Sequence, residues 1–282
     1  MASFFSAMLR LTRFGNLLII GFAQTATAFF LVGSHTWQTF SLWLLSNSTI
    51  IIAAAGYIIN DYYDIKIDYI NKPERVVIGK IIPRRFAILF HTLFSVSGIA
   101  IGFYLSWQIG VIHFFSAFML WLYSNSLKRL PLIGNVVIAF LTSLSVFIIA
   151  VYYKTNFNLI LIYALFAFFI SLVREVVKDM EDLKGDITFG CKTLPILWGI
   201  RKTKFFLYTV LVVFVLIVLV LDSYFTILPS VYFMSFLFLP LAWFALRLHR
   251  ADTVKDFRWL SNLSKMIMLL GIISMLFLPA QV

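Results

Sequence analysis

The chain has 282 residues, of which 62% are hydrophobic and only 12% are charged, and its formal net charge is +11. A soluble domain usually has about a quarter of its residues charged, so this composition excludes an ordinary soluble protein and favours a polytopic membrane protein. The apolar runs are continuous, which excludes a β-barrel with its short alternating strands. The single cysteine, Cys191, excludes a disulfide or a thiolate metal site within one chain.

The apolar runs predict nine transmembrane helices in one all-α domain, residues 1–282. The first run is long and no small-residue cleavage site follows it, so we expect a membrane helix and not a cleaved signal peptide. The histidines are scattered along the chain, which favours isolated polar roles over a haem or zinc site. The predicted helices span residues 14–33, 40–60, 86–106, 109–124, 132–153, 157–177, 204–222, 226–247 and 261–279.

Charge is distributed asymmetrically between the two ends of these predicted helices. If the amino terminus lies in the cytoplasm, every Lys and Arg except Lys154 falls on the cytoplasmic side, as the positive-inside rule requires. Topology therefore explains the positive charge without nucleic acid as a partner, and the sequence predicts an integral protein of the cell (inner) membrane. Every acidic residue except Asp222 also lies on the cytoplasmic side, and because the rule does not govern acidic residues, this asymmetry needs another cause.

The first acidic motif follows the second predicted helix, in "YIINDYYDIKIDYINKPERV", residues 57–76. Asp61, Asp64 and Asp68 stand at positions i, i+3 and i+7, which lie on one face of an α-helix. Like charges at this spacing repel each other, so we expect a compensating cation. A solvated charged face at the membrane boundary is the alternative interpretation.

The second acidic motif follows the sixth predicted helix, in "REVVKDMEDLKGD", residues 174–186. Asp179, Asp182 and Asp186 repeat the spacing of the first motif, and we expect them to form a second carboxylate stripe on a helix. The repetition argues against the solvated face and hints at an internal repeat of a four-helix unit. Two facing carboxylate stripes would hold two Mg²⁺ ions around one diphosphate, because Mg²⁺ shares its oxygen ligands between protein, water and phosphate.

These two motifs resemble those of the UbiA superfamily of intramembrane prenyltransferases. "NDYYDIKID" fits the pattern N-D-x-x-D-x-x-x-D, and "DMEDLKGD" fits D-x-x-D-x-x-x-D. The flanks "NKPERV", "YSNSLKRLPLIGN" and "GDITFGCKTLPILWG" are also similar. The resemblance implies two groups of four helices around a central cavity, with both motifs at its cytoplasmic mouth. Mg²⁺ and an isoprenoid diphosphate would bind there, with the prenyl tail in an apolar tunnel open to lipid.

The resemblance also implies roles for individual residues. Tyr123 and Lys128 would flank the reaction centre, with an interfacial aromatic and a topology-determining charge as the alternatives. Arg75 could likewise be an ordinary cytoplasmic charge. Asn16 fits an opening R-x-x-N pattern, and a helix–helix hydrogen bond is its alternative role. The implied metal ligands are Asp61, Asp64, Asp68, Asp179, Asp182 and Asp186, and the implied diphosphate ligands are Asn60, Arg75, Lys128 and Lys178.

The acceptor is predicted from the second motif. "REVVKDMEDLKGDITFGCKTLPILWG" most resembles the digeranylgeranylglyceryl phosphate synthase branch of the superfamily, which implies transfer of a geranylgeranyl-like group to the hydroxyl of a prenylglyceryl phosphate. We expect Arg174, Lys178 and Lys192 to supply charge for the acceptor phosphate, and Glu175 and Glu181 are candidate bases. The alternative acceptor is an aromatic ring of the hydroxybenzoate, naphthoate or homogentisate type.

Two other functional classes compete with a prenyltransferase. An ion-coupled transporter would place charges near the bilayer midplane and break its helices with Gly or Pro, whereas the carboxylates here lie at predicted helix ends. A CDP-alcohol phosphotransferase would carry an Asp-Gly/Ala-Arg motif, which the sequence lacks.

Overall fold

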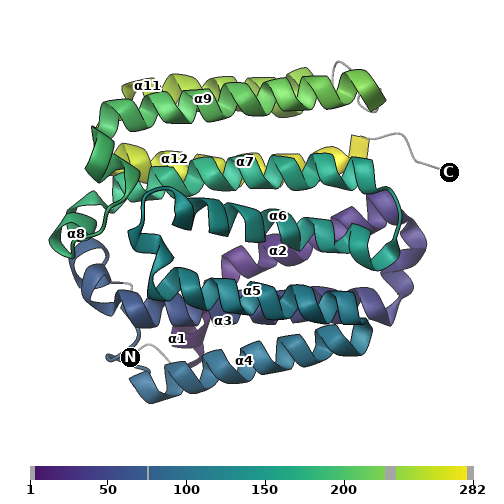
Figure 1. The fold of residues 1–282 in the computed structure, drawn as a ribbon, viewed down its shortest axis with the longest axis horizontal. Helices are drawn as coiled ribbons and strands as arrows, with labels where there is room; N and C mark the ends of the chain where they lie inside the picture. The colour runs from purple at the N-terminus through teal and green to yellow at the C-terminus, as the bar shows by residue number, and fades with distance from the viewer. Residues whose placement is uncertain (1–3, 75, 226–232, 278–282) are drawn as a thin grey trace.

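The structure, a computed structural model, describes residues 4–74, 76–225 and 233–277. Its long helices lie side by side, and those that follow one another in the chain run antiparallel (Figure 1). Within the described residues no strand forms, and the only β-type pairing is the isolated bridge between Ile78 and Ile82. This confirms the predicted all-α class. Helices are expected from these apolar runs because a helix satisfies its own backbone hydrogen bonds in lipid.

The long helices follow the chain in a simple up-and-down order, with short helices at some of the turns. The first four are α1 (Phe4–Leu11), α2 (Phe14–Thr27) with the π-helical extension η1 (Ala28–Val32), α3 (Phe40–Asn71) and α4 (Arg84–Leu105). They are followed by α5 (Trp107–Asn125), α6 (Ile133–Tyr153), α7 (Phe157–Glu181) and the short α8 (Leu183–Thr188). The last are α9 (Leu194–Phe225), the π-helical η4 (Phe233–Phe238), α11 (Leu239–Arg250) and α12 (Val254–Ser274).

Seven helical segments of the described chain are long and apolar enough to cross a membrane. Their bounds are Phe14–Val32, Phe40–Asn71, Arg84–Leu105, Ile133–Tyr153, Phe157–Glu181, Leu194–Leu221 and Val254–Phe277. The predicted span 109–124 corresponds to α5, and residues 233–247 of the predicted span 226–247 correspond to η4 and α11, whereas residues 226–232 lie outside the described residues. These helices are not among the seven. The chain is therefore an integral membrane protein, and the count of nine spans stays a prediction.

Two helices extend well beyond their predicted bounds. The apolar run predicted a helix over 40–60, but α3 continues to Asn71 and carries the whole first acidic motif in helical conformation. The seventh predicted helix begins at residue 204, but α9 begins at Leu194 and bends at Gly199. The backbone φ of 75° and ψ of 163° at Gly199 lies in a region that only glycine adopts readily, so this residue permits the bend.

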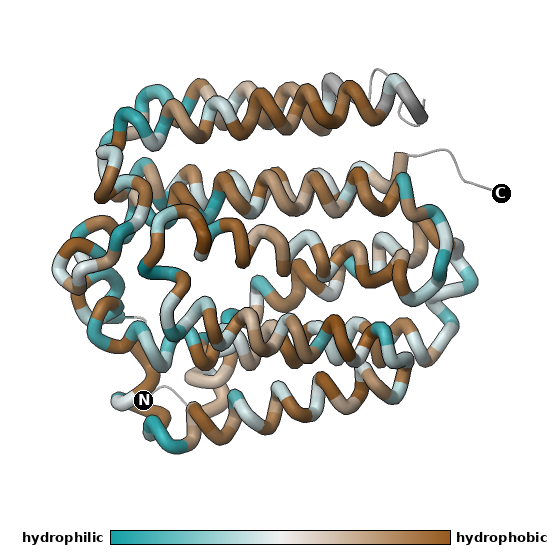
Figure 2. The backbone as a smooth tube through the Cα atoms, in the orientation of Figure 1, coloured by the Kyte–Doolittle hydropathy of each residue, from teal (hydrophilic) through white to brown (hydrophobic). Residues whose placement is uncertain are grey.

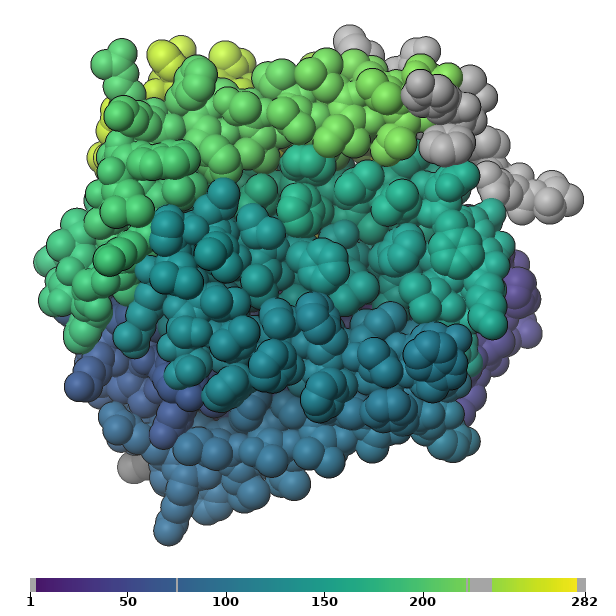
Figure 3. Space-filling view, viewed as in Figure 1, coloured from purple at the N-terminus to yellow at the C-terminus, as the bar shows by residue number. Residues whose placement is uncertain are grey.

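The helix α7 occupies the centre of the bundle. Within its apolar window 67% of the residues are buried, compared with 17% for α4, which therefore presents most of its side chains to lipid. Side chains such as Val173, Val176 and Val177 pack against α9 and α12 in the largest core cluster. Figure 3 shows one face of the molecule, closed by side chains of the helices coloured blue to green. Because α7 packs against α6, α9 and α12, the acidic motif at its end has a defined position.

Both acidic motifs lie at the same end of the bundle, which we call the acidic end. The helices α3 and α7 end there, and α4 and α9 begin there (Figure 1). Hydrophilic segments gather at this end, whereas the middle of the bundle is mainly hydrophobic (Figure 2). The fold therefore brings together two segments that are far apart in the sequence.

Candidate active site

A polar cavity of about 690 Å³ opens at the acidic end, between α1, α2, α3, α5, α7, α8 and α12. We call it the mouth cavity. Of the predicted site residues only Arg75 lies outside the described residues. The described residues among the predicted metal, diphosphate and reaction-centre residues all line the mouth cavity: Asn60, Asp61, Asp64, Asp68, Tyr123, Lys128, Lys178, Asp179, Asp182 and Asp186. The fold thus gathers residues from three separate stretches of sequence around one space.

The first acidic motif forms the predicted carboxylate stripe. Because α3 is continuous to Asn71, Asp61, Asp64 and Asp68 project from one helical face into the mouth cavity. Asp64 accepts a hydrogen bond from Lys128 Nζ at 2.6 Å, and Asp61 accepts one from the Arg13 guanidinium at 2.7 Å. Two of the three carboxylates are therefore held by cations from other segments.

The prediction of a second stripe on one continuous helix is wrong. The helix α7 ends at Glu181, Asp182 has φ −94° and ψ 7°, and Asp186 lies on the separate helix α8. Asp179, Asp182 and Asp186 nevertheless all line the mouth cavity, because the break turns α8 back toward it. The two motifs therefore meet as predicted, but with different backbone geometry.

Asn71, the last residue of α3, stabilises this break. Its side-chain amide donates to the carbonyl of Asp182 at 3.1 Å and accepts from the backbone N–H of Gly185 at 2.9 Å. The Gly185 N–H also donates to the Asp182 carbonyl at 3.1 Å, so the Asn71 amide adds bonds from α3 to a backbone turn that is already closed. A Cβ at Gly185 would overlap the Asn71 amide, so the close approach requires glycine at this position. The sequence carries no local signal for this contact.

Lys72, which follows the first motif, forms ion pairs with acidic residues of the second motif. Its ammonium lies 2.7 Å from Asp182 and 3.4 Å from Glu181, and Arg258 of α12 lies 3.1 Å from the same glutamate. Sequence reasoning assigned no role to Lys72 or Arg258. Lys72 stands in the "NKPERV" flank, which was a usable signal, whereas nothing in the sequence near Arg258 points to the acidic motifs.

The chemistry of the cavity suits Mg²⁺, although the protein does not provide a preformed metal cage. Within the described residues no three His, Cys, Asp or Glu side chains converge closely enough to bind a metal by themselves. Mg²⁺ usually takes only one or two carboxylates and completes its shell with water and phosphate oxygens. The Asn60 Oδ1 atom is buried and has no hydrogen-bond partner among the described residues, so it is an available oxygen ligand.

Negative charge at the second motif is incompletely balanced. Burial, followed by the neighbouring Asp182 and Asp64 carboxylates, raises the pKa of Asp186 to about 7. Among the described residues, neither Asp68 nor Asp186 forms an ion pair. A divalent cation between the motifs would relieve this repulsion.

A second cavity, of about 160 Å³, continues from the mouth cavity toward the middle of the bundle. We call it the inner cavity. The two cavities share Arg13, Asn16, Asn60, Tyr123, Arg174, Glu175 and Lys178. Beyond them the walls include the apolar residues Ile52, Ala53, Leu120 and Leu141. This arrangement agrees with the expected polar mouth and largely apolar interior, with Tyr123 at the passage between them.

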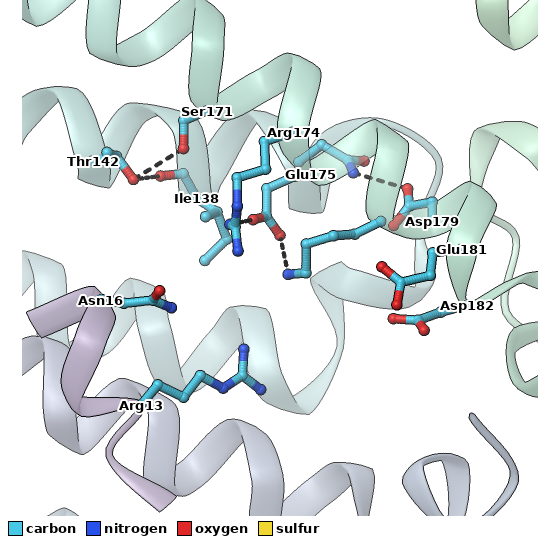
Figure 4. Close-up of polar contacts among 12 residues, drawn as sticks. Arg13, Asn16, Ile138, Thr142, Ser171, Arg174, Glu175, Asp179, Glu181 and Asp182 are labelled. Carbon is cyan, nitrogen blue, oxygen red and sulfur yellow. Dashed lines mark hydrogen bonds and ion pairs between the residues drawn. The ribbon is translucent and has the colours of Figure 1, made fainter. Parts of the chain in front are cut away.

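Two groups of polar residues face each other across this passage (Figure 4). On one wall, Glu175 accepts from Arg174 at 2.6 Å and from Lys178 Nζ at 2.8 Å. On the opposite wall Arg13 lies over the Tyr57 ring, 5.1 Å from its centroid, and Asn16 donates to the Tyr57 hydroxyl at 3.3 Å. Asn16 therefore makes the helix–helix hydrogen bond considered as its alternative role, and it also lines both cavities.

The structure changes three further expectations about charged residues. Lys192 is exposed and lines neither cavity, so the structure does not bring it to the expected acceptor phosphate. Glu175 and Glu181 were candidate bases, but each is already held by two cations. Arg13 was missed as a site residue, although the R-x-x-N pattern that drew attention to Asn16 begins with it.

Comparison with known proteins identifies the family to which this chain belongs. The UbiA prenyltransferase family profile matches residues 21–270. The digeranylgeranylglyceryl phosphate synthase of Sulfurisphaera tokodaii is 36% identical over 251 residues, covering 87% of this chain and 88% of its own length. That of Saccharolobus solfataricus is 39% identical over 199 residues, covering 69% and 70%.

Solved structures show the same fold. A structure from work on digeranylgeranylglyceryl phosphate synthase in membranes has a TM-score of 0.74 at 24% identity and covers 97% of both chains. A UbiA homologue from Archaeoglobus fulgidus bound to DMAPP and Mg²⁺ has a TM-score of 0.65 at 16% identity, covering 97% of this chain and 100% of its own.

Proposed function

The chain belongs to the UbiA prenyltransferase family, and we propose that it transfers a geranylgeranyl-like group from an isoprenoid diphosphate to the hydroxyl of a prenylglyceryl phosphate. It is a membrane-embedded prenyltransferase. The observation that carries the acceptor and site assignments is the single mouth cavity lined by both acidic motifs, which continues into the inner cavity. Relatives named for this reaction match most of the chain.

The donor diphosphate is proposed to bind between the two motifs. Asn60, Asp64 and Asp68 from one side and the second-motif aspartates from the other would hold Mg²⁺, which neutralises charge on the leaving pyrophosphate when bound. Lys128 Nζ lies 2.6 Å from Asp64, beside the first motif, where its charge stabilises the same leaving group. Mg²⁺ bound with DMAPP in a UbiA homologue supports this use of the cavity.

Tyr123 is proposed to act at the reacting carbon. It lines both the mouth cavity and the inner cavity, which supports a position where the diphosphate gives way to the prenyl chain. When the bond between C1 and the diphosphate oxygen breaks, the ring of Tyr123 stabilises the allylic cation through its π face. The apolar walls of the inner cavity keep water away from that cation.

The wall formed by Arg174, Glu175 and Lys178 is proposed to bind the acceptor phosphate. Two cations share one carboxylate there, which leaves a net positive charge facing the passage. The Arg174 Nε–H is buried and has no hydrogen-bond partner among the described residues, so it is available to a phosphate oxygen. A glyceryl phosphate dianion is attracted to this positive charge more strongly than the single carboxylate of an aromatic acid is.

The departing pyrophosphate is proposed to receive the acceptor proton. Glu175 and Glu181 each already form ion pairs with two cations, and accepting a proton would cost those contacts. The new ether bond forms between the acceptor oxygen and C1, the C1–O bond of the diphosphate breaks, and the hydroxyl proton leaves with pyrophosphate. Charge therefore balances without a protein base.

Purified protein in lipid nanodiscs tests this function with radiolabelled geranylgeranyl diphosphate and a panel of acceptors. We expect a doubly prenylated glyceryl phosphate, with stoichiometric pyrophosphate, from geranylgeranylglyceryl phosphate. Prenylation of 4-hydroxybenzoate or dihydroxynaphthoate, with no product from the glyceryl phosphate, would overturn the acceptor and leave the prenyltransferase assignment intact.

A further inference from the structure

The interior of the protein branches. A third cavity, of about 60 Å³, lies between α2, α6, α7 and α12, and we call it the side arm. It shares Ile20, Thr142 and Ser145 with the inner cavity, so the two spaces meet at these residues. Ser171 donates to Thr142 Oγ1 at 3.2 Å at the same junction (Figure 4). From this junction the inner cavity extends toward α3 and α5, and the side arm extends toward α7 and α12.

The inner cavity and the side arm each lie along a helix that lines a different part of the mouth cavity. On α3, Asn60, Gly56 and Ala53 follow at helical spacing and line the inner cavity, so that space begins directly below the first acidic motif. On α7, Lys178, Arg174 and Ser171 line the inner cavity, and Ala167 and Tyr163 continue along the same helical face into the side arm. The α7 wall is the one proposed above for the acceptor phosphate.

The chemistry of the product requires room for two chains. The product of the proposed function carries two prenyl chains on one glycerol, so both chains must diverge from one point when the ether bond forms. We propose that the donor chain lies in the α3–α5 part of the inner cavity and that the prenyl chain of the acceptor enters the side arm. This inference rests on the proposed function and adds a binding subsite for the acceptor.

The walls of the side arm suit an isoprenoid chain. They are almost entirely apolar and include Met268 and Met275, whose flexible side chains adapt to irregular apolar ligands. The ring of Phe166 occupies the space that a Cβ at Gly271 would need, so α12 approaches α7 closely and keeps the side arm narrow. A single chain fits such a passage better than a bulky aromatic head group does.

Two matched replacements of alanine by leucine distinguish the side arm from the α3–α5 part of the inner cavity. Ala167→Leu narrows the side arm and Ala53→Leu narrows the α3–α5 space, and both positions are half-buried. Ala167→Leu should raise the acceptor KM by about tenfold for geranylgeranylglyceryl phosphate, with less effect on a shorter-chain acceptor and a donor KM within about twofold of wild type. Ala53→Leu should show the reverse selectivity.

A photoreactive acceptor with a diazirine near the end of its chain provides a second readout in the unmodified protein. Labelling should map to the α7 and α12 peptides that contain Ala167, Met268 and Met275. Labelling only of lipid-facing residues such as Leu93 and Val96, or an equal rise of both KM values in Ala167→Leu, would overturn the side-arm assignment. If wild-type protein makes no product from the glyceryl phosphate acceptor, the proposed function itself fails, which is a different outcome.

Discussion

Asn71→Ala should disturb the site through the break between α7 and α8, because this side chain contacts the break from α3. The substitution removes the bond to the Asp182 carbonyl at 3.1 Å and the bond from the Gly185 N–H at 2.9 Å. A typical protein hydrogen bond contributes about 1 kcal/mol, so the loss destabilises the docked position of α8 by about 2 kcal/mol. Such a loss changes the ratio of docked to undocked α8 by a factor of about 30.

The expected result is a local defect and not a folding defect. Asp182 stands at the break and Asp186 follows it on α8, so the Mg²⁺ concentration for half-maximal activity and the donor KM should both rise, by up to about thirtyfold. Thermal unfolding in detergent should change little, because the buried core of α7 does not include Asn71. Steady-state kinetics across a Mg²⁺ titration measures both values.

Asn158→Ala is the matched control, since Asn158 is an exposed asparagine in the first turn of α7, at the opposite end of that helix. It should behave as wild type. If Asn71→Ala retains the wild-type Mg²⁺ requirement and donor KM, Asn71 does not position the second motif and the reasoning is refuted.

Other predictions test the metal, the topology and the acceptor wall. Asp64→Asn and Asp182→Asn should each remove most turnover without loss of membrane insertion, and EDTA should abolish wild-type activity until Mg²⁺ is restored; near-normal turnover in either variant would contradict a two-motif site. Reporters fused after residue 36 or at the carboxyl terminus should read as extracytoplasmic, and those near residues 72 and 190 as cytoplasmic; opposite readings for 72 and 190 would separate the motifs. Lys178→Ala should raise the acceptor KM more than the donor KM, and an equal effect on both would argue against an acceptor role.

Local sequence was sufficient to predict the membrane class, the approximate helices and the first carboxylate stripe. These features depend on continuous apolar runs and on side-chain spacing within one helix, and both can be read from neighbouring residues. The two motifs were expected to meet because they repeat one spacing and share one end of the predicted topology. The structure places both around the mouth cavity.

Only the tertiary structure decided how the second motif is built. Periodicity predicted one helix through Asp186, but α7 ends at Glu181, and Asn71 bonds to Asp182 from 111 residues away in the chain. The roles of Lys72 and Arg258 and the junction between the inner cavity and the side arm likewise depend on contacts between distant helices. Helical spacing describes one segment at a time, whereas an ion pair, a helix break or a cavity wall forms only when packing brings separate segments within a few ångströms of each other.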